Sequence, residues 1–397
     1  MKVSVSQPIS VGIVAALVGF TSSFAVVLAG LDNVGASAAQ ATLGLMALNF
    51  IQGAMNVWLS LRHRKPFMTA WSTPGAAVLI SVAGVQGGWP AAVGAFIVTG
   101  LLIFLTGLWP LLGRLIAMIP APVAQAMLAG VLLMICIAPV VALAANPVLV
   151  APIILVWLLL MRFAQRWATP AAFLLALVMI GWSVMANSSH SFSIPAVNLA
   201  PTMPTLTVSA VVGIAIPLYI VTMASQNVPG AAVMKAYGYE VPWRESLLLT
   251  GTGTVVGATF GTHALNLAAI TAALTASSEA HPNPNKRWIA STSAGCTYIV
   301  LGFLTPLLTA MVAASPDGLI ETVAGLALIS TLVVSLAEAF RNSAQRIATG
   351  LTFIVAASPI TLFGVGAAFW GLVVGLIAWA VFRKSGAVAL ATTTKVK

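Results

Sequence analysis

The positions of the basic residues constrain this chain more than any other feature of its sequence. Its 17 Lys and Arg residues occur in short groups that are separated by long, mainly apolar intervals. Since 60% of the residues are hydrophobic and only 6% are charged, a soluble domain could not cover this much apolar surface. The sequence therefore predicts an all-α polytopic membrane protein. The basic residues that produce the net charge of +10 then lie at the ends of membrane spans. The charge therefore does not indicate binding of nucleic acid.

The apolar intervals between successive basic groups set the number of spans. There are seven intervals, most of them with a polar or Pro/Gly break near the middle that carries neither Lys nor Arg. Two spans in each interval predict fourteen transmembrane segments, with both termini and all the basic groups on the cytoplasmic side. The expected spans are about 10–30, 38–60, 70–84, 90–108, 118–142, 148–161, 168–186, 207–226, 245–260, 263–278, 287–311, 318–337, 345–357 and 360–382.

A long polar loop at 187–204 divides the spans into two sets of seven. An odd number of spans in each set forces opposite orientations, so related halves would be inverted repeats. Short matches at an offset of about 195 residues support this relation: 119–120 with 315–316, 171–173 with 367–369, and 73–76 with 266–269. We therefore expect an N-terminal seven-span repeat over 1–190, an outer linker over 191–206 and a C-terminal seven-span repeat over 207–397.

The third span is expected to be broken. The apolar run 76–83, which follows the basic cluster 62–65, is too short to cross a bilayer as a helix. We expect an extended segment over 66–72 and then a half-helix that begins inside the membrane, with Thr73 as N-cap and Pro74 as its first residue. The alternative is a turn outside the membrane that precedes an ordinary span.

The repeat predicts the same break in the tenth span, with Asn266 as the N-cap of its half-helix. The electropositive starts of both half-helices would then face one cavity at mid-depth, which suits an anion. Neither start carries Lys or Arg, so neutral groups would hold the anion. The expected donors are the side chains of Ser72 and Thr73 and the backbone of Gly75, and His263 and Asn266 are expected to bind the anion with them.

Polar side chains inside other spans are further candidates, because such groups are costly in a membrane. Ser225, Gln226 and Asn227 end the eighth span, and they either bind substrate or cap the helix. Ser22 and Ser23 occupy the corresponding region of the first span, where a hydroxyl binds either substrate or its own backbone. Gln52 and Asn56, one turn apart on the second span, are expected to join helices rather than to contact a ligand.

His263 is the one titratable side chain beside the proposed site, and it is either a proton carrier or a structural residue. Most of the seven Asp and Glu residues fall at predicted span ends or in loops. The sequence contains no nucleotide-binding, nucleophile–base or metal-ligand pattern. We therefore expect neither an enzyme nor a metal or other cofactor.

Four motifs resemble the benzoate membrane transporter family: residues 69–77, 217–230, 267–273 and 279–288. The resemblance covers nearly the whole chain in order, although Asn283 stands where the family pattern often has Asp. It implies proton-coupled uptake of benzoate or a related aromatic carboxylate across the bacterial inner membrane. It also implies the fold of the nucleobase/ascorbate and sulfate-type anion transporters.

In that fold, spans 1–4 and 8–11 form a core and spans 5–7 and 12–14 form a gate, which implies an elevator movement of one against the other. The resemblance places the substrate between broken spans 3 and 10, beside spans 1 and 8. If the substrate is an aromatic carboxylate, we expect Phe24, Phe67, Tyr219 or Phe260 near its ring. Related folds often dimerise, so a homodimer is an open expectation. Two alternatives for function also stay open: a carrier of a nucleobase or small inorganic anion, and a non-saturable anion channel.

Overall fold

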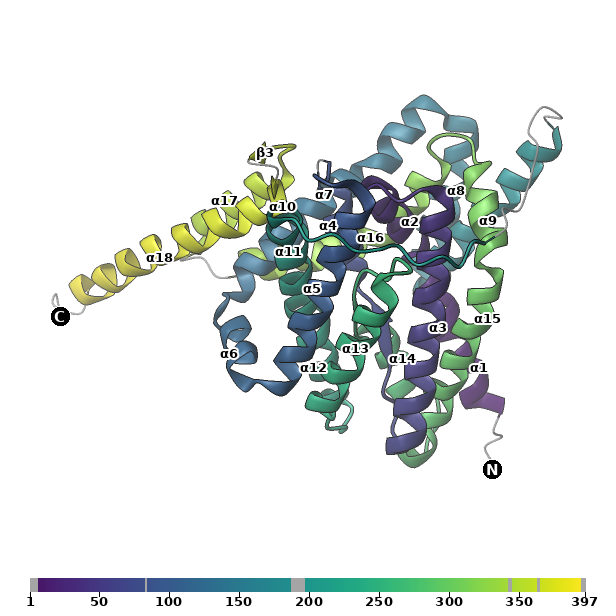
Figure 1. Ribbon diagram of the computed structural model, residues 1–397, viewed down its shortest axis with the longest axis horizontal. Coiled ribbons are helices and arrows are strands. Elements are labelled where there is room, and N and C mark those ends of the chain that lie inside the picture. The colour runs from purple at the N-terminus through teal and green to yellow at the C-terminus, as the bar shows by residue number, and fades with distance from the viewer. Residues whose placement is uncertain (1–5, 83, 187–196, 342–344, 363–364, 394–397) are drawn as a thin grey trace.

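A computed structural model describes residues 6–82, 84–186, 197–341, 345–362 and 365–393. Within these ranges the chain is a bundle of helices with two small sheets (Figure 1). By length and composition, seven helices could cross a membrane, and three shorter apolar helices accompany them. This confirms an all-α polytopic membrane protein, while the count of fourteen spans stays a prediction.

The N-terminal half contains α1 (Ser6–Thr21), α2 (Phe24–Asn33), α3 (Ala38–His63), β1 (Thr69–Trp71), α4 (Thr73–Ile80), α5 (Gly88–Leu108), α6 (Pro110–Met118), α7 (Ala121–Ala145), α8 (Pro147–Phe163) and α9 (Gln165–Ala186). Two features of this half were not predicted. The first span is interrupted at Ser22 and Ser23, between α1 and α2, and the short helix α6 follows the fourth span.

The C-terminal half begins with α10 (Val208–Ala210), η1 (Val211–Ala215), α11 (Ile216–Thr222), η2 (Met223–Asn227), α12 (Val228–Ala236), α13 (Trp243–Ala258), β2 (Leu265–Leu267) and α14 (Ile270–Ala276). It continues with η3 (Pro284–Lys286), α15 (Trp288–Ala313), α16 (Leu319–Phe340), α17 (Arg346–Ala357), β3 (Thr361–Leu362), β4 (Val365–Gly366) and α18 (Ala367–Thr393). The last helix therefore begins later than the predicted residue 360, because β3 and β4 form a small hairpin before it.

The eighth span is longer than predicted, because its helix continues to Ala236 instead of ending at 226. The interpretation that Ser225 to Asn227 cap a helix end is therefore wrong. The π-helical turns η1 and η2 each end two residues before a proline, Pro217 and Pro229. A proline has no N–H to give to the preceding turn, and the helix accommodates this by widening rather than by stopping.

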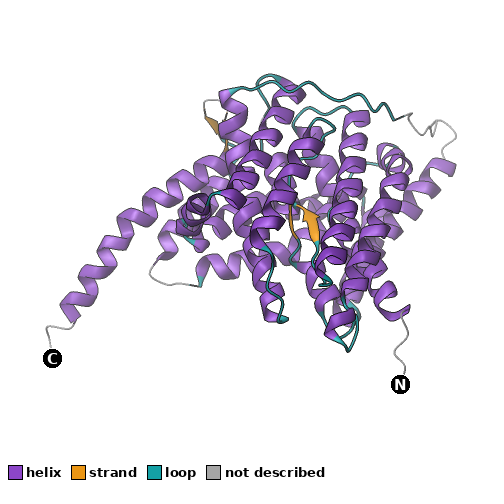
Figure 2. Cartoon of the chain, turned by 60° about the horizontal axis from the view of Figure 1, so that its bottom comes forward, coloured by secondary structure: helices purple, strands orange, loops and turns teal. Residues whose placement is uncertain are grey.

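The third and tenth spans are both broken, as predicted, and their extended segments meet inside the bundle (Figure 2). Strands β1 and β2 pair antiparallel, with Ala70 opposite Asn266. The half-helices α4 and α14 follow them in the chain. Ser72 rather than Thr73 is the N-cap of α4. Asn266 is not the N-cap of α14, because strand pairing holds it extended and the helix begins only at Ile270.

Side chains from neighbouring helices satisfy the outer edges of this two-stranded sheet. On the β1 edge, Asn56 Oδ1 accepts the Thr69 N–H at 2.5 Å and Gln52 Oε1 accepts the Trp71 N–H at 2.8 Å. On the β2 edge, Asn227 Oδ1 accepts the Leu267 N–H at 2.8 Å and Thr254 Oγ1 accepts the Leu265 N–H at 3.0 Å. These four acceptors are buried, so they replace the water that an exposed sheet edge would use.

The motif 279–288 closes the other end of α14. Arg287 donates from Nε to the His281 carbonyl at 2.8 Å and from Nη1 to the carbonyl of Ala276, the last residue of α14, at 2.7 Å. A buried cation at a helix C-terminus is favourable, because the last carbonyl groups lack partners in the helix. Part of the family-like motif therefore has a structural role at the end of α14.

Helices α4 and α16 have different main packing partners. Helix α4 packs chiefly against α2 and α11, and α16 packs chiefly against α7, although α4 also contacts α7 and α16 also contacts α2. Helices α3 and α15 pack closely where Gly53 faces Gly295, since a Cβ on either glycine would lie 2.7 Å from the carbonyl oxygen of the other. The boundaries of the two repeats and of the core and gate stay predictions.

We predict that Asn56→Ala lowers the free energy of unfolding by about 1–3 kcal/mol, because it leaves a buried backbone N–H of β1 without an acceptor. Asn49→Ala is the matched control, since Asn49 is equally buried on α3 but its amide donates to the Leu45 carbonyl and to the Thr305 hydroxyl, and to no strand. Thermal unfolding of the purified protein in detergent measures both effects. Equal losses in the two variants would contradict the proposed role of Asn56.

Candidate functional site

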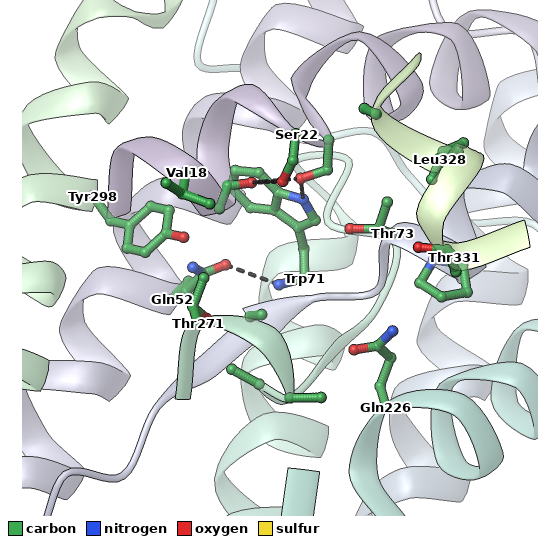
Figure 3. A pocket seen from close by; sticks show the side chains of 17 residues that line it. Val18, Ser22, Gln52, Trp71, Thr73, Gln226, Thr271, Tyr298, Leu328 and Thr331 are labelled. Atoms are coloured by element: carbon green, nitrogen blue, oxygen red, sulfur yellow. Dashed lines mark hydrogen bonds between the residues drawn. The ribbon is translucent and has the colours of Figure 1, made fainter. Parts of the chain in front are cut away.

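A small cavity lies where the interruption of the first span meets the sheet and the starts of α4 and α14 (Figure 3). Its volume is about 100 Å³, which suits a compact ligand. Helices α1, α3, α15 and α16 and the π-turn η2 supply the rest of its wall. The polar and aromatic side chains that line it are Ser22, Ser23, Gln52, Trp71, Thr73, Gln226, Thr271, Tyr298 and Thr331.

The start of α4 presents one backbone donor to this cavity. Ser72 Oγ accepts the N–H of Gly75 at 3.1 Å and the hydroxyl of Thr222 at 2.9 Å. Pro74 has no N–H, and the Ser72 carbonyl accepts the next N–H of the helix. Thr73 is therefore left, among the described residues, with an N–H that has no partner, and its side chain points into the cavity (Figure 3).

The start of α14 borders the same cavity through Ala268, Ala269 and Thr271. Its N-cap, Ala269, provides no side-chain hydrogen bond. The N–H of Ala268 is already used, because it donates to the Met68 carbonyl at 2.9 Å. Both half-helices thus begin at one cavity, and α4 brings to it the hydroxyl and free N–H of Thr73.

Aromatic side chains form the opposite end of the cavity. The ring of Trp71 lies edge-on to Tyr298, with 5.9 Å between centroids, and its Nε1 donates to Ser23 Oγ at 2.7 Å. Figure 3 shows these rings across the cavity from Thr73 and Gln226. The cavity therefore has Thr73 and Gln226 at one end and two aromatic rings, with the amide of Gln52 beside them, at the other. The four aromatic residues expected near the ring of a ligand do not line it: Phe24, Phe67, Tyr219 and Phe260.

Four of the predicted site residues line the cavity: Ser22, Ser23, Thr73 and Gln226. Ser22 and Ser23 both donate to the Gly19 carbonyl, at 3.1 and 2.8 Å, so each hydroxyl bonds to its own backbone. Gln226 reaches the cavity from η2, next to Asn227, which holds β2. The widened turn thus places one side chain on the ligand side and its neighbour on the sheet.

The remaining predicted residues lie behind the wall of the cavity: Ser72, Gly75, Tyr219, Ser225, Asn227, His263 and Asn266. The Ser225 hydroxyl is buried with no hydrogen-bond partner among the described residues, whereas others of this set bond to neighbouring elements. The Tyr219 hydroxyl bonds to Thr106 at 2.5 Å, and Asn266 donates from Nδ2 to the Leu267 carbonyl at 2.7 Å. These residues support the site from outside rather than form its surface.

His263 is fully buried and contacts the residue that caps α4. Its Nε2 lies 3.0 Å from the Ser72 carbonyl oxygen, while its Nδ1 has no hydrogen-bond partner among the described residues. The imidazole therefore contacts Ser72, the N-cap of α4, and does not line the cavity itself.

Among the polar and aromatic residues that line the cavity, the sequence analysis missed five: Gln52, Trp71, Thr271, Tyr298 and Thr331. The spacing of Gln52 and Asn56 was a usable signal, since side chains one helical turn apart can reach alternate N–H groups of an adjacent strand. Trp71 lies within a motif already recognised. Tyr298 and Thr331 stand in apolar helices with no local pattern that distinguishes them.

The fold matches solved membrane domains of known transporters. The transmembrane domain of the cyanobacterial bicarbonate transporter BicA has a TM-score of 0.61 at 16% identity, covering 94% of this chain and 96% of that one. SLC26A9 has a TM-score of 0.62 at 13% identity, covering 96% of this chain and 66% of that one. This likeness confirms the inverted-repeat fold of these membrane domains.

The sequence relatives give the family. The family model described as benzoate membrane transport protein matches residues 2–381. The inner membrane protein YdcO of Escherichia coli (strain K12) is 39% identical over 94% of this chain and 95% of its own length. The benzoate membrane transport protein of Acinetobacter baylyi is 25% identical, with 94% of each chain covered. The chain belongs to the benzoate membrane transport protein family.

Proposed function

We propose that this protein imports benzoate or a closely related aromatic carboxylate, together with protons, across the bacterial inner membrane. The observation that supports this most is a single cavity with neutral hydrogen-bond donors at one end and two aromatic rings at the other. A benzoate-like anion has the same two ends. Membership of the benzoate family supports the same substrate class.

In this proposal the carboxylate lies at the start of α4. The N–H and hydroxyl of Thr73 and the amide of Gln226 donate to it, and the positive end of the helix favours the negative charge. The ring of the substrate lies against Trp71 and Tyr298, where aromatic pairs favour edge-on or offset contact. Ser22 and Ser23 close the cavity above the ring.

The uncharged lining of the cavity is the reason to propose that a proton is transported with the carboxylate. None of the described side chains that line it is charged. Transfer of an unpaired carboxylate from water into such a site is costly, and a proton that enters with it removes most of that cost. Either the carboxylate itself or His263 carries this proton. We place it on His263, because its Nε2 donates to the Ser72 carbonyl while its Nδ1, which has no hydrogen-bond partner among the described residues, can take up a proton.

The proposed orientation puts both termini and the basic clusters on the cytoplasmic side, by the positive-inside rule. Transport then requires the helices around the cavity to open alternately to the two sides, and an elevator movement of the core against the gate would do this. Assembly as a homodimer stays a prediction.

We predict that proteoliposomes containing the purified protein accumulate labelled benzoate when the outside is more acidic than the inside, with saturable kinetics. Uptake that ignores the pH gradient would contradict proton coupling. Competition by uracil or sulfate, but not by unlabelled benzoate, would instead indicate a carrier of another substrate. A flux that never saturates would indicate an anion channel.

We predict that His263→Gln abolishes gradient-driven accumulation but keeps benzoate exchange between equal pools on the two sides. The glutamine amide can still donate to the Ser72 carbonyl, but it cannot take up a proton. His63→Gln is the control, since His63 does not line the cavity and its Nε2 contacts the Glu245 carboxylate. Accumulation by His263→Gln equal to that of the unchanged protein would assign the proton to the substrate.

A further inference from the structure

One wall of the cavity comes from α16, a helix outside the broken-span motif. Ala327, Leu328 and Thr331 line the cavity from this helix, within one turn of each other. The first two present only carbon atoms. Thr331 therefore supplies the side-chain polar group that faces the cavity from α16.

The hydroxyl of Thr331 has no hydrogen-bond partner among the described residues, and the side chain is only partly buried. This differs from other threonines in the same region of the fold. On α16 itself, Thr322 donates to the Gly318 carbonyl at 2.5 Å, and on α17 Thr352 donates to the Ala348 carbonyl at 2.8 Å. A hydroxyl within a membrane helix usually bonds back to its own backbone in this way. Thr331 is thus free to bond to a ligand.

Thr331 lies at the end of the cavity that Thr73 and Gln226 line. In Figure 3 it lies on the same side as Thr73 and Gln226, away from the rings of Trp71 and Tyr298. Because the whole cavity has a volume of only about 100 Å³, a ligand that touches Thr73 also reaches the facing helix. A ligand group at this end therefore meets donors from α4, η2 and α16 together.

We propose that Thr331 donates a hydrogen bond to the substrate carboxylate, so that the bound anion joins α16 to the start of α4. This assignment rests on the proposed function. A carboxylate has two oxygens, which together accept about four hydrogen bonds. One oxygen can accept from Thr73 and the other from Thr331. A neutral ligand of the same shape with one acceptor can accept a hydrogen bond from only one of these two residues. Thr331, on α16, would therefore help the site to distinguish a carboxylate from a neutral ligand, and it is in this sense a specificity-determining residue.

The same geometry has a consequence for transport. Helix α16 packs chiefly on α7 and α4 packs chiefly on α2 and α11, although α4 also contacts α7 and α16 also contacts α2. With the carboxylate in place, α4 and α16 share a ligand. Binding therefore favours the arrangement in which the two walls are close, which is what a carrier needs in order to enclose its substrate.

The test is isothermal titration of benzoate into the purified full-length protein and three variants. Thr331→Val keeps the shape of the side chain and removes the hydroxyl, so the dissociation constant should rise about tenfold. Thr331→Ser keeps the hydroxyl and should stay within about threefold of the unchanged protein. Thr322→Val, on the same helix but facing its own backbone, should bind benzoate normally. Thermal unfolding of all four proteins shows whether any loss is structural.

The outcomes separate the two proposals. If benzoate binds the unchanged protein and Thr331→Val equally well, or if Thr331→Ser loses as much affinity as Thr331→Val, then the hydroxyl does not bind the carboxylate and the assignment is overturned. If the unchanged protein does not bind benzoate, the proposed function is overturned, and the assignment that rests on it falls with it.

Discussion

The pairing of two short strands inside the bundle is the interaction on which the rest of this structure depends. Each strand interrupts a span, so its N–H and C=O groups would be exposed at a depth where no water can satisfy them. The inward-facing backbone groups of the two strands bond to each other, with Ala70 opposite Asn266. The outward N–H groups donate instead to buried side chains of neighbouring helices: Gln52, Asn56, Asn227 and Thr254. The amides that hold the sheet are therefore as necessary as the strands.

The broken spans have a use as well as a cost. A continuous helix buries all its backbone groups, so it can offer a ligand only side chains. A helix that begins at mid-depth offers a free N–H and a positive end, and here Thr73 adds its own hydroxyl beside them. Because these donors are neutral, the site can attract a carboxylate without holding it as strongly as a buried Arg would. Weak, neutral binding is suited to a carrier, which must release its substrate on the other side.

Some of this architecture followed from simple lengths and charges. The break in the third span was predictable because the run 76–83 is too short to cross and the basic cluster 62–65 fixes where the crossing must start. The error at Asn266 arose because a good N-cap residue was instead paired in a strand, and that pairing depends on a partner almost 200 residues away. The early end given to the eighth span came from Pro229, which a membrane helix accommodated with a π-turn. The inward direction of Tyr298 and Thr331 is set by packing between helices, which neither residue's neighbours in the sequence encode.

The central claim is that the substrate carboxylate lies at the end of the cavity that Thr73 and Gln226 line, with the substrate ring beside Trp71 and Tyr298 at the other end. Anomalous diffraction from crystals of the protein with 4-bromobenzoate tests this most directly, because bromine marks the ring carbon opposite the carboxylate. The account predicts one bromine peak beside Trp71 and Tyr298, with density for the carboxylate next to Thr73. A peak beside Thr73, or one outside the cavity, would contradict it.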